Sequence, residues 1–260
     1  MRLLFAAAAA LCSLSSTGSQ ASDAFAPSAV TFAYKVRHDT RPDADAAIVL
    51  ATRVYPVPAK RVAVFSDGIQ RRGLVLAFHS ATSWADHTFQ SCNRFLSVHA
   101  LGFSFYNILH CTNWVVNGMG ERFPKLPVIW IEAGLSWIPF VMQRIDHEYM
   151  LRPSECPLLK KKPSDYMRDM YYSVQPMEIQ DMEALECTFR MMDAENTLLY
   201  ASDYPHWDFD MPSTIWDLPF LTDKARHNIL GGTAHKLFKL PPRNEAQKQN
   251  LIRHGNYVSG

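Results

Sequence analysis

The chain has 260 residues, an apolar fraction of 48% and a formal net charge of +1 at pH 7. This length suits one large domain or two small ones, and an α/β barrel routinely occupies it alone. The balanced charge and ordinary apolar content exclude a disordered chain and give no sign of a nucleic-acid surface.

The first 21 residues have the form of a secretory signal or of a low-complexity, alanine-rich leader. Met1-Arg2 precede an apolar run over residues 3–14, which is too short to span a bilayer, and small residues follow near Ala21. The five cysteines are irregularly spaced, which is more typical of reduced thiols than of a disulfide scaffold. The body of the chain therefore favours a cytoplasmic protein, a working leader would make it secreted, and no membrane span is expected.

Residues 22–61 are rich in proline and predict a poorly structured segment, in which only 46–54 could form a short strand or helix. Asp43 and Asp45 are interpreted as solvated loop residues rather than a metal-binding turn. The structured body is expected over residues 62–240. The polar tail, residues 241–260, is expected to fray.

Apolar runs alternate with amphipathic stretches along the body. The runs predict buried strands at residues 74–78, 128–131, 170–174 and 197–201. The stretches predict helices at residues 62–72, 104–117, 137–149, 179–193 and 223–238, with loop and helix between 84 and 99. This alternation is typical of parallel strands joined by crossover helices.

Three of the four predicted strands end on an ionisable side chain, namely His79, Glu132 and Asp203. Parallel strands point the same way, so these three side chains should converge at one rim of the sheet. An imidazole and two carboxylates suit a divalent cation, and they equally suit a metal-free relay of protons between histidine and carboxylate.

Several segments resemble the amidohydrolase-related family, in the branch of aminocarboxymuconate-semialdehyde decarboxylase. Ser202-Asp203-Tyr204-Pro205-His206 resembles the last-strand motif of that family. Residues 121–126 and 128–134, Trp137-Ile138-Pro139, Arg144-Ile145-Asp146 and Ile229-Leu230-Gly231-Gly232 also match its habits, so the likeness covers about 64–240. It implies a (β/α)8 barrel, a divalent metal, usually zinc, and carboxy-lyase (decarboxylase) or hydrolase chemistry.

The resemblance also implies roles for individual residues. His79 corresponds to a metal-binding histidine, and Asp203 to a metal ligand that can also manage the proton of bound water. Glu132 stands where the decarboxylases keep a catalytic histidine, and as a second catalytic group it could still accept a proton. His206, Trp137 and Trp84 are candidates to bind an aromatic or unsaturated carboxylic acid, with packing as the alternative for the two tryptophans.

The front of the family pattern is missing, because no His-x-His pair occurs in the chain. A complete βα repeat needs about 30 residues, so the stretch before residue 74 holds one or two at most. The predicted fold is therefore α/β, the C-terminal half of a TIM-type barrel. Two functions stay open: a metal-dependent enzyme acting on a small carbonyl or carboxylate compound, and a catalytically silent half-barrel. Open strand edges would favour a homo-oligomer or another partner chain in either case.

Overall fold

The computed structural model describes residues 69–71, 73–80 and 87–258, together with the backbone of four short upstream strands. These strands are β1 (Val30–Thr31), β2 (Lys35–Arg37), β3 (Ala46–Ala51) and β4 (Pro56–Val57). The predicted leader, residues 1–21, lies outside the described residues, as does Trp84. β1 and β4 pair with each other in a small antiparallel sheet.

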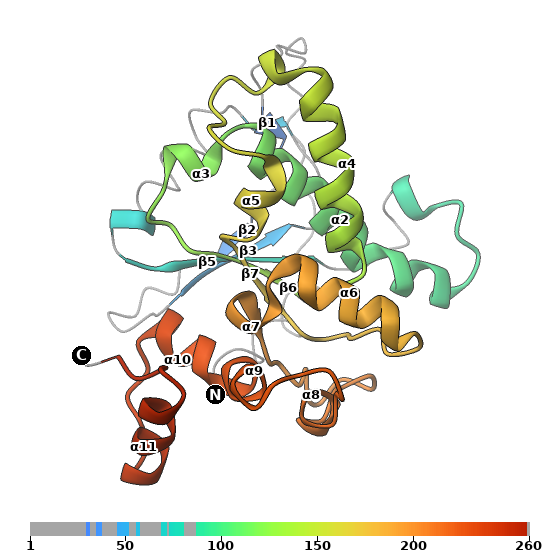
Figure 1. Ribbon diagram of the computed structural model, residues 1–260. Helices are drawn as coiled ribbons and strands as arrows, with labels where there is room; N and C mark the ends of the chain where they lie inside the picture. Colours follow the sequence, from blue (N-terminus) through green and yellow to red (C-terminus); the bar gives the residue numbers. More distant parts are fainter. Residues whose placement is uncertain are drawn as a thin grey trace.

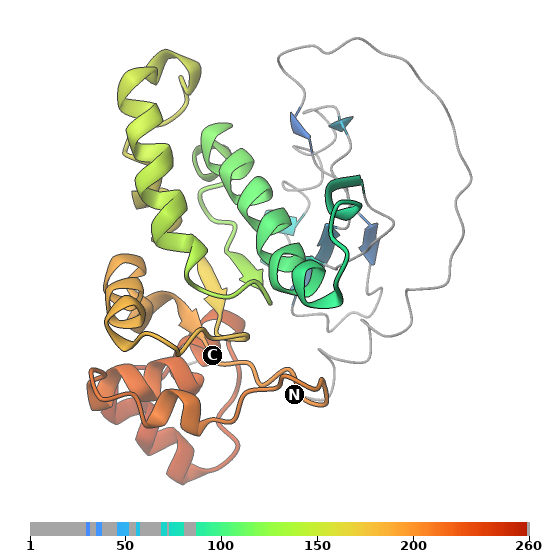
Figure 2. The same ribbon diagram turned by 90° about the vertical axis from the view of Figure 1, so that its right-hand side faces the viewer.

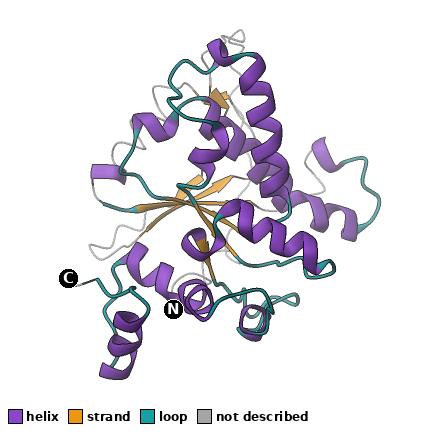
Figure 3. Cartoon of the chain, in the orientation of Figure 1, coloured by secondary structure: helices purple, strands orange, loops and turns teal. Residues whose placement is uncertain are grey.

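The main sheet has six strands in the order β2-β3-β5-β6-β7-β8. Figure 3 shows strands near the centre of the molecule with helices around them. The last four strands in the sheet order come from the predicted apolar runs: β5 (Val75–Ser80), β6 (Val128–Ile131), β7 (Tyr171–Ser173) and β8 (Leu198–Leu199). Within this sheet β3, β5, β6, β7 and β8 run parallel, and among its described strands only the edge strand β2 runs antiparallel to its neighbour. Among the described strands β8 pairs only with β7, so the sheet is open.

Helices connect the parallel strands, as the predicted α/β half-barrel requires (Figure 1). After β5 come the short 3₁₀ turn η1 (His87–Phe89), α2 (Phe95–Val116) and α3 (Met119–Arg122). After β6 come α4 (Trp137–Leu151), the 3₁₀ turn η2 (Pro153–Glu155) and α5 (Pro163–Met167). α6 (Met182–Met192), whose first turn is capped by the Asp181 carboxylate, and α7 (Ala194–Thr197) lead from β7 to β8. Within the described part of the chain, no helix combines the length and apolar character needed to cross a bilayer.

The two faces of the sheet bury different neighbours, because side chains alternate along each strand. One face, with Phe78, Trp130 and Tyr172, packs against α2, α4 and α6 in the main core. Figure 2 shows these helices standing together on one side of the strands. The opposite face would line the interior of a complete barrel, and there Val75 and Ala77 pack against α10. The C-terminal helices therefore cover part of the apolar surface that an open half-barrel would expose.

The C-terminal region differs from two expectations. The helix predicted at 223–238 is divided into α9 (Asp223–His227), the π-helical segment η3 (Asn228–Gly232) and α10 (Thr233–Phe238), with a kink at Gly231. Ahead of them, α8 (Ser213–Trp216) follows β8.

The prediction of a frayed tail is wrong, because α11 (Glu245–Arg253) forms beyond the two prolines. The Asn244 side chain caps this helix by accepting a hydrogen bond from Gln247 N at 2.8 Å. Leu251 and Asn256 are buried, and the Asn256 amide donates to Asn228 Oδ1 at 2.7 Å. The tail is therefore docked on the body at a polar contact that its composition did not reveal.

Candidate active site

The first pair of candidate residues lies where β5 and β6 end. In the parallel register His79 stands beside Ile131, so the next residue of the second segment, Glu132, reaches the same rim. His79 Nε2 lies 2.6 Å from Glu132 Oε2, and both side chains are largely buried. His79 Nδ1 lies 2.6 Å from the Ser80 carbonyl oxygen and donates to it, which fixes the ring and directs Nε2 toward the carboxylate.

The second pair lies beyond β8, on the loop that the Ser202–His206 motif forms. Asp203 is buried, and its Oδ2 accepts a hydrogen bond of 2.7 Å from Nδ1 of His206, which is half exposed. Glu132, Asp203 and His206 each offer one ligand atom, and these three atoms lie within 4.8 Å of one another. The structure thus brings His79, Glu132 and Asp203 to one rim. Glu132 contacts His79, and His206, rather than His79, is the third member of the ligand group.

Glu132 and Asp203 each come after a strand, and each has an unusual backbone conformation. Glu132 has φ 55° and Asp203 has φ 57°, in the left-handed region that L-residues other than asparagine and aspartate seldom adopt. Glu132 N donates to Ser173 Oγ at 2.9 Å, so the end of β7 holds the turn after β6 in place. This anchoring is what keeps the Glu132 side chain pointed along the rim.

Charge and burial shift the pKa of His79 and of Asp203. Burial alone would lower the pKa of His79, but the hydrogen bond and the charge of Glu132 outweigh it, so the pKa lies above its usual 6.5. Burial raises the pKa of the Asp203 carboxyl above its usual 3.8, the charge of Glu132 raises it further, and the hydrogen bond from His206 opposes both. Asp203 is therefore the carboxyl at this rim with a physical reason to hold a proton.

Trp137 does not join this group. It is buried in the main core, where its indole N–H donates to the Gly134 carbonyl at 3.0 Å and its ring meets Tyr172 edge to face. This is the packing alternative rather than substrate binding.

A different group of aromatic side chains, His99, Phe103 and Trp207, borders the rim and was not predicted from the sequence. The His99 ring lies 5.2 Å from the ring of Trp207 and 5.6 Å from that of Phe103, which in turn lies 6.3 Å from His79. His99 Nε2 also lies 3.8 Å from Asp208 Oδ2. Trp207 is 74% exposed, an unusual state for the largest apolar side chain. Its position directly after His206 in the strand-end motif was the available signal.

Two polar residues at the end of β7 were also not predicted from the sequence. Ser173 supports Glu132 as described, and Gln175 is buried with its amide donating to the Asp208 carbonyl at 3.3 Å. Gln175 Oε1 is buried and has no hydrogen-bond partner within the described residues. The strand that contains Ser173 was predicted, but Ser173 and Gln175 are not ionisable and therefore do not stand out as charged strand ends do.

Comparison with known proteins places this geometry in a family. Residues 33–240 match the family model described as Amidohydrolase, and that match begins upstream of the predicted body. No curated protein sequence matches the chain.

Solved structures share the fold at low sequence identity. The 5-carboxyvanillate decarboxylase of Sphingomonas paucimobilis is 22% identical, with a TM-score of 0.52, over 67% of this chain and 52% of that one. The dihydroxybenzoic acid decarboxylase of Polaromonas sp. JS666, with bound manganese and the inhibitor 2-nitroresorcinol, is 19% identical, with a TM-score of 0.56, over 75% of this chain and 61% of that one. The 5-carboxyvanillate decarboxylase of Novosphingobium aromaticivorans, complexed with manganese, is 19% identical, with a TM-score of 0.53, over 67% and 50%.

The chain thus spans about half to three fifths of these structures. The predicted half-barrel and the predicted family are both confirmed. On the extent of the family match and on the shared fold, this chain belongs to the amidohydrolase family.

Proposed function

We propose that the chain is a divalent-metal-dependent carboxy-lyase or hydrolase that acts on a small aromatic or unsaturated carboxylic acid. The observation that carries the proposal is the meeting of the His79–Glu132 and Asp203–His206 pairs at one rim of a parallel sheet. Active sites of barrel enzymes lie at this rim, where the carboxyl ends of the strands converge.

The donor set fits a divalent metal. Imidazole nitrogens and carboxylate oxygens are the ligands that zinc and manganese accept, and His79, Glu132 and Asp203 would hold the ion, with His206 beside them. The hydrogen bond from His79 Nδ1 to a backbone carbonyl supports this assignment, because metal-binding histidines usually donate their second N–H in this way. When bound, such an ion polarises a carboxylate or carbonyl oxygen and lowers the pKa of water. Zinc remains the metal predicted from the family, whereas two of the structural neighbours contain manganese.

The protein's own residues then supply binding and proton transfer. In decarboxylation the bond between the carboxylate and the substrate carbon breaks, carbon dioxide leaves, and the electron pair that stays on carbon takes up one proton. Asp203, with its raised pKa, is placed to hold that proton, and His206 links it to solvent through the 2.7 Å hydrogen bond. In hydrolysis the same pair would instead take a proton from water. Glu132 is the second acid or base in either reaction, and Trp207 and Phe103 provide apolar surface for the substrate.

The alternative is a catalytically silent half-barrel, and the metal separates the two. Protein purified without chelator is expected to contain one more divalent ion per chain than His79→Ala purified in the same way, when both are measured by atomic emission. Metal-loaded protein should release carbon dioxide from, or hydrolyse, a panel of small aromatic carboxylic acids that includes 2,6-dihydroxybenzoate and 5-carboxyvanillate. Asp203→Asn should lower kcat/KM by about 10²- to 10⁴-fold, the usual contribution of a positioned acid or base. Asp217→Asn, at an exposed carboxylate after α8, is the matched control.

Absence of turnover at any concentration of the chain, with equal metal content in wild type and His79→Ala, would support the silent form. Activity that appears only as concentration rises, in step with dimer formation seen by light scattering, would identify a second copy as the partner of the open sheet.

A further inference from the structure

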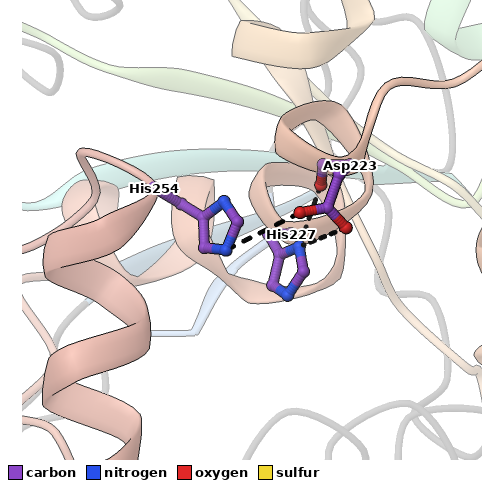
Figure 4. Close-up of side chains that lie close together, drawn as sticks. All are labelled: Asp223, His227 and His254. Atoms are coloured by element: carbon purple, nitrogen blue, oxygen red, sulfur yellow. Dashed lines mark hydrogen bonds and ion pairs between the residues drawn. The ribbon is translucent and has the colours of Figure 1, made fainter.

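A second group of ligating side chains lies in the C-terminal region, on residues that the candidate active site does not use. Asp223 and His227 belong to α9, and His254 follows the last residue of α11 (Figure 4). Each offers one ligand atom, and these atoms lie within 4.8 Å of one another. His227 Nδ1 is 3.5 Å from Asp223 Oδ1, and His254 Nε2 is 4.0 Å from Asp223 Oδ2.

The local sequence explains why these groups meet. Asp223 and His227 are four residues apart on one helix, so they lie on the same face, and the Thr222 hydroxyl caps that helix by accepting from Ala225 N at 3.1 Å. His254 is brought over by the docked tail. Asn256, two residues further along the chain, is buried. Its side-chain amide donates to Asn228 Oδ1 at 2.7 Å, and its backbone N–H donates to the Leu251 carbonyl at 2.7 Å. The group therefore joins two segments that are each fixed independently.

The two imidazoles are arranged face to face. The rings of His227 and His254 are stacked, with centroids 3.8 Å apart and planes 10° from parallel. Both rings are mostly buried, whereas the Asp223 carboxylate beside them is exposed. Figure 4 shows one nitrogen of each ring turned toward that carboxylate. Two imidazole nitrogens and a carboxylate oxygen, open to solvent on one side, are the donor set of a three-ligand site for zinc or a similar ion.

We propose that Asp223, His227 and His254 form a second binding site for a divalent transition metal, made of residues other than those of the active site. A tetrahedral ion with bonds of about 2.0–2.1 Å needs its ligand atoms about 3.3 Å apart, so the group must close slightly and the two ring planes must open from their stack. To bind the ion, His227 Nδ1 also gives up its 2.9 Å hydrogen bond to the Asp223 backbone carbonyl. These are side-chain movements at an exposed carboxylate and at the residue after a helix end.

A bound ion would link α9 to the end of α11. Because the ligands come together only in the folded chain, the ion stabilises the fold, by an amount that grows with the logarithm of its concentration above the dissociation constant. The site is a structural clamp on the C-terminal helix, and its three protein ligands leave one position for water.

The test uses Zn²⁺ alone and the full chain carrying Glu132→Gln and Asp203→Asn, so that the active-site carboxylates do not contribute. Titration against a chromophoric chelator is expected to show one Zn²⁺ per chain, and Co²⁺ should give the visible absorption of a four-coordinate site. Adding His227→Gln or His254→Gln should each weaken binding by more than about 100-fold, beyond the loss caused by removing a merely supporting group. His147→Gln, at an exposed histidine of α4, controls for surface binding.

A thermal melt with and without Zn²⁺ gives an independent readout. The melting temperature should rise with Zn²⁺ in the background protein and in His147→Gln, and stay unchanged in the two ligand variants. The metal-free melts show whether each variant folds, and either histidine alone suffices for the test. Failure to bind Zn²⁺ in the background protein, or binding that survives both histidine substitutions, overturns the proposal. Neither result bears on the active-site metal, which is measured in the protein without the background substitutions.

Discussion

Glu132 and Asp203 share one backbone conformation, with φ of 55° and 57°, on two different segments that meet at the same rim. A left-handed backbone costs an L-residue such as Glu132 roughly 1–2 kcal/mol, whereas aspartate tolerates it. Burial and the charge of Glu132 both raise the pKa of Asp203, so the two carboxylates oppose each other. Strain and charge repulsion in one place are typical of a site selected for function rather than for stability.

Asp203→Asn is therefore expected to preserve or raise stability while it lowers the proposed activity. The pKa of Asp203 is raised in the folded state, so its ionisation above the unfolded pKa costs folding energy that an amide does not. Asparagine also tolerates the left-handed backbone, whereas alanine does not. Urea unfolding at pH 7 should place Asp203→Asn within about 1 kcal/mol of wild type or above it, and Asp203→Ala about 1–2 kcal/mol below Asp203→Asn. Equal stability of the two variants would mean that the backbone at residue 203 is not held in the left-handed region that disfavours alanine.

The His79–Glu132 pair is expected to be coupled. His79→Ala leaves the Glu132 carboxylate largely buried without its partner, which typically costs about 3–5 kcal/mol. Glu132→Ala should cost less, because it also removes a residue from the rim that repels Asp203. A double-mutant cycle by denaturant unfolding in the absence of metal should give a coupling energy of at least about 1 kcal/mol. Additive single effects would show that the 2.6 Å contact contributes nothing to the metal-free fold.

His110 should make the core sensitive to acid. Burial against Phe78 lowers the pKa of this imidazole from 6.5 to about 4. Between these values the unfolded chain binds a proton that the folded chain does not, so stability falls as pH decreases from about 6.5 to 4, by up to about 3 kcal/mol, and is unaffected by this group above 6.5.

Comparing wild type with His110→Phe at pH 7 and pH 5 isolates that contribution. The phenylalanine variant should lose less stability on acidification, and the exposed His147→Ala variant should behave as wild type. An equal loss in wild type and His110→Phe would mean that the imidazole is protonated within the fold.

Gly232→Ala should displace the C-terminal tail. A Cβ on Gly232 would overlap the amide of Asn256, which is held between the Gly232 backbone and Asn228. The expected cost is about 1–3 kcal/mol, as for overpacking at other closely packed positions. Hydrogen exchange of α11 should rise toward that of a fraying helix, whereas Gly73→Ala, which strains a φ of +66° but meets no other group within 4 Å, should leave α11 protected. Unchanged protection of α11 in Gly232→Ala would mean that this contact does not hold the tail.

The strands and their convergence could be predicted because both depend on local sequence. Continuous apolar runs gave β5 and β6 almost to the residue, and parallel direction alone brought His79 and Asp203 to one rim. The ends of α2 and the break at Gly231 were not predicted, because tertiary packing sets them and the apolar pattern continues across both.

The tail and the aromatic border show where local signals are ambiguous. Asn244 followed by Gln247 is a helix-start signal, but a polar segment after two prolines reads as loop unless the buried site that receives it is known. Trp137 and Trp207 are equally plausible as substrate contacts in the sequence, and only the fold buries the first and exposes the second. The packing of α4 against the sheet buries Trp137, and the loop after β8 leaves Trp207 exposed.

The contact between Asn256 and Asn228 has a practical consequence for anyone who shortens the protein. A chain cut at residue 240, where the family match stops, would discard α11 and strip the amide that fills the space beside Gly232. It would also remove His254, whose ring is stacked on that of His227. Such a fragment should still collapse around the parallel strands, yet melt earlier and precipitate more readily than the chain retained through residue 258.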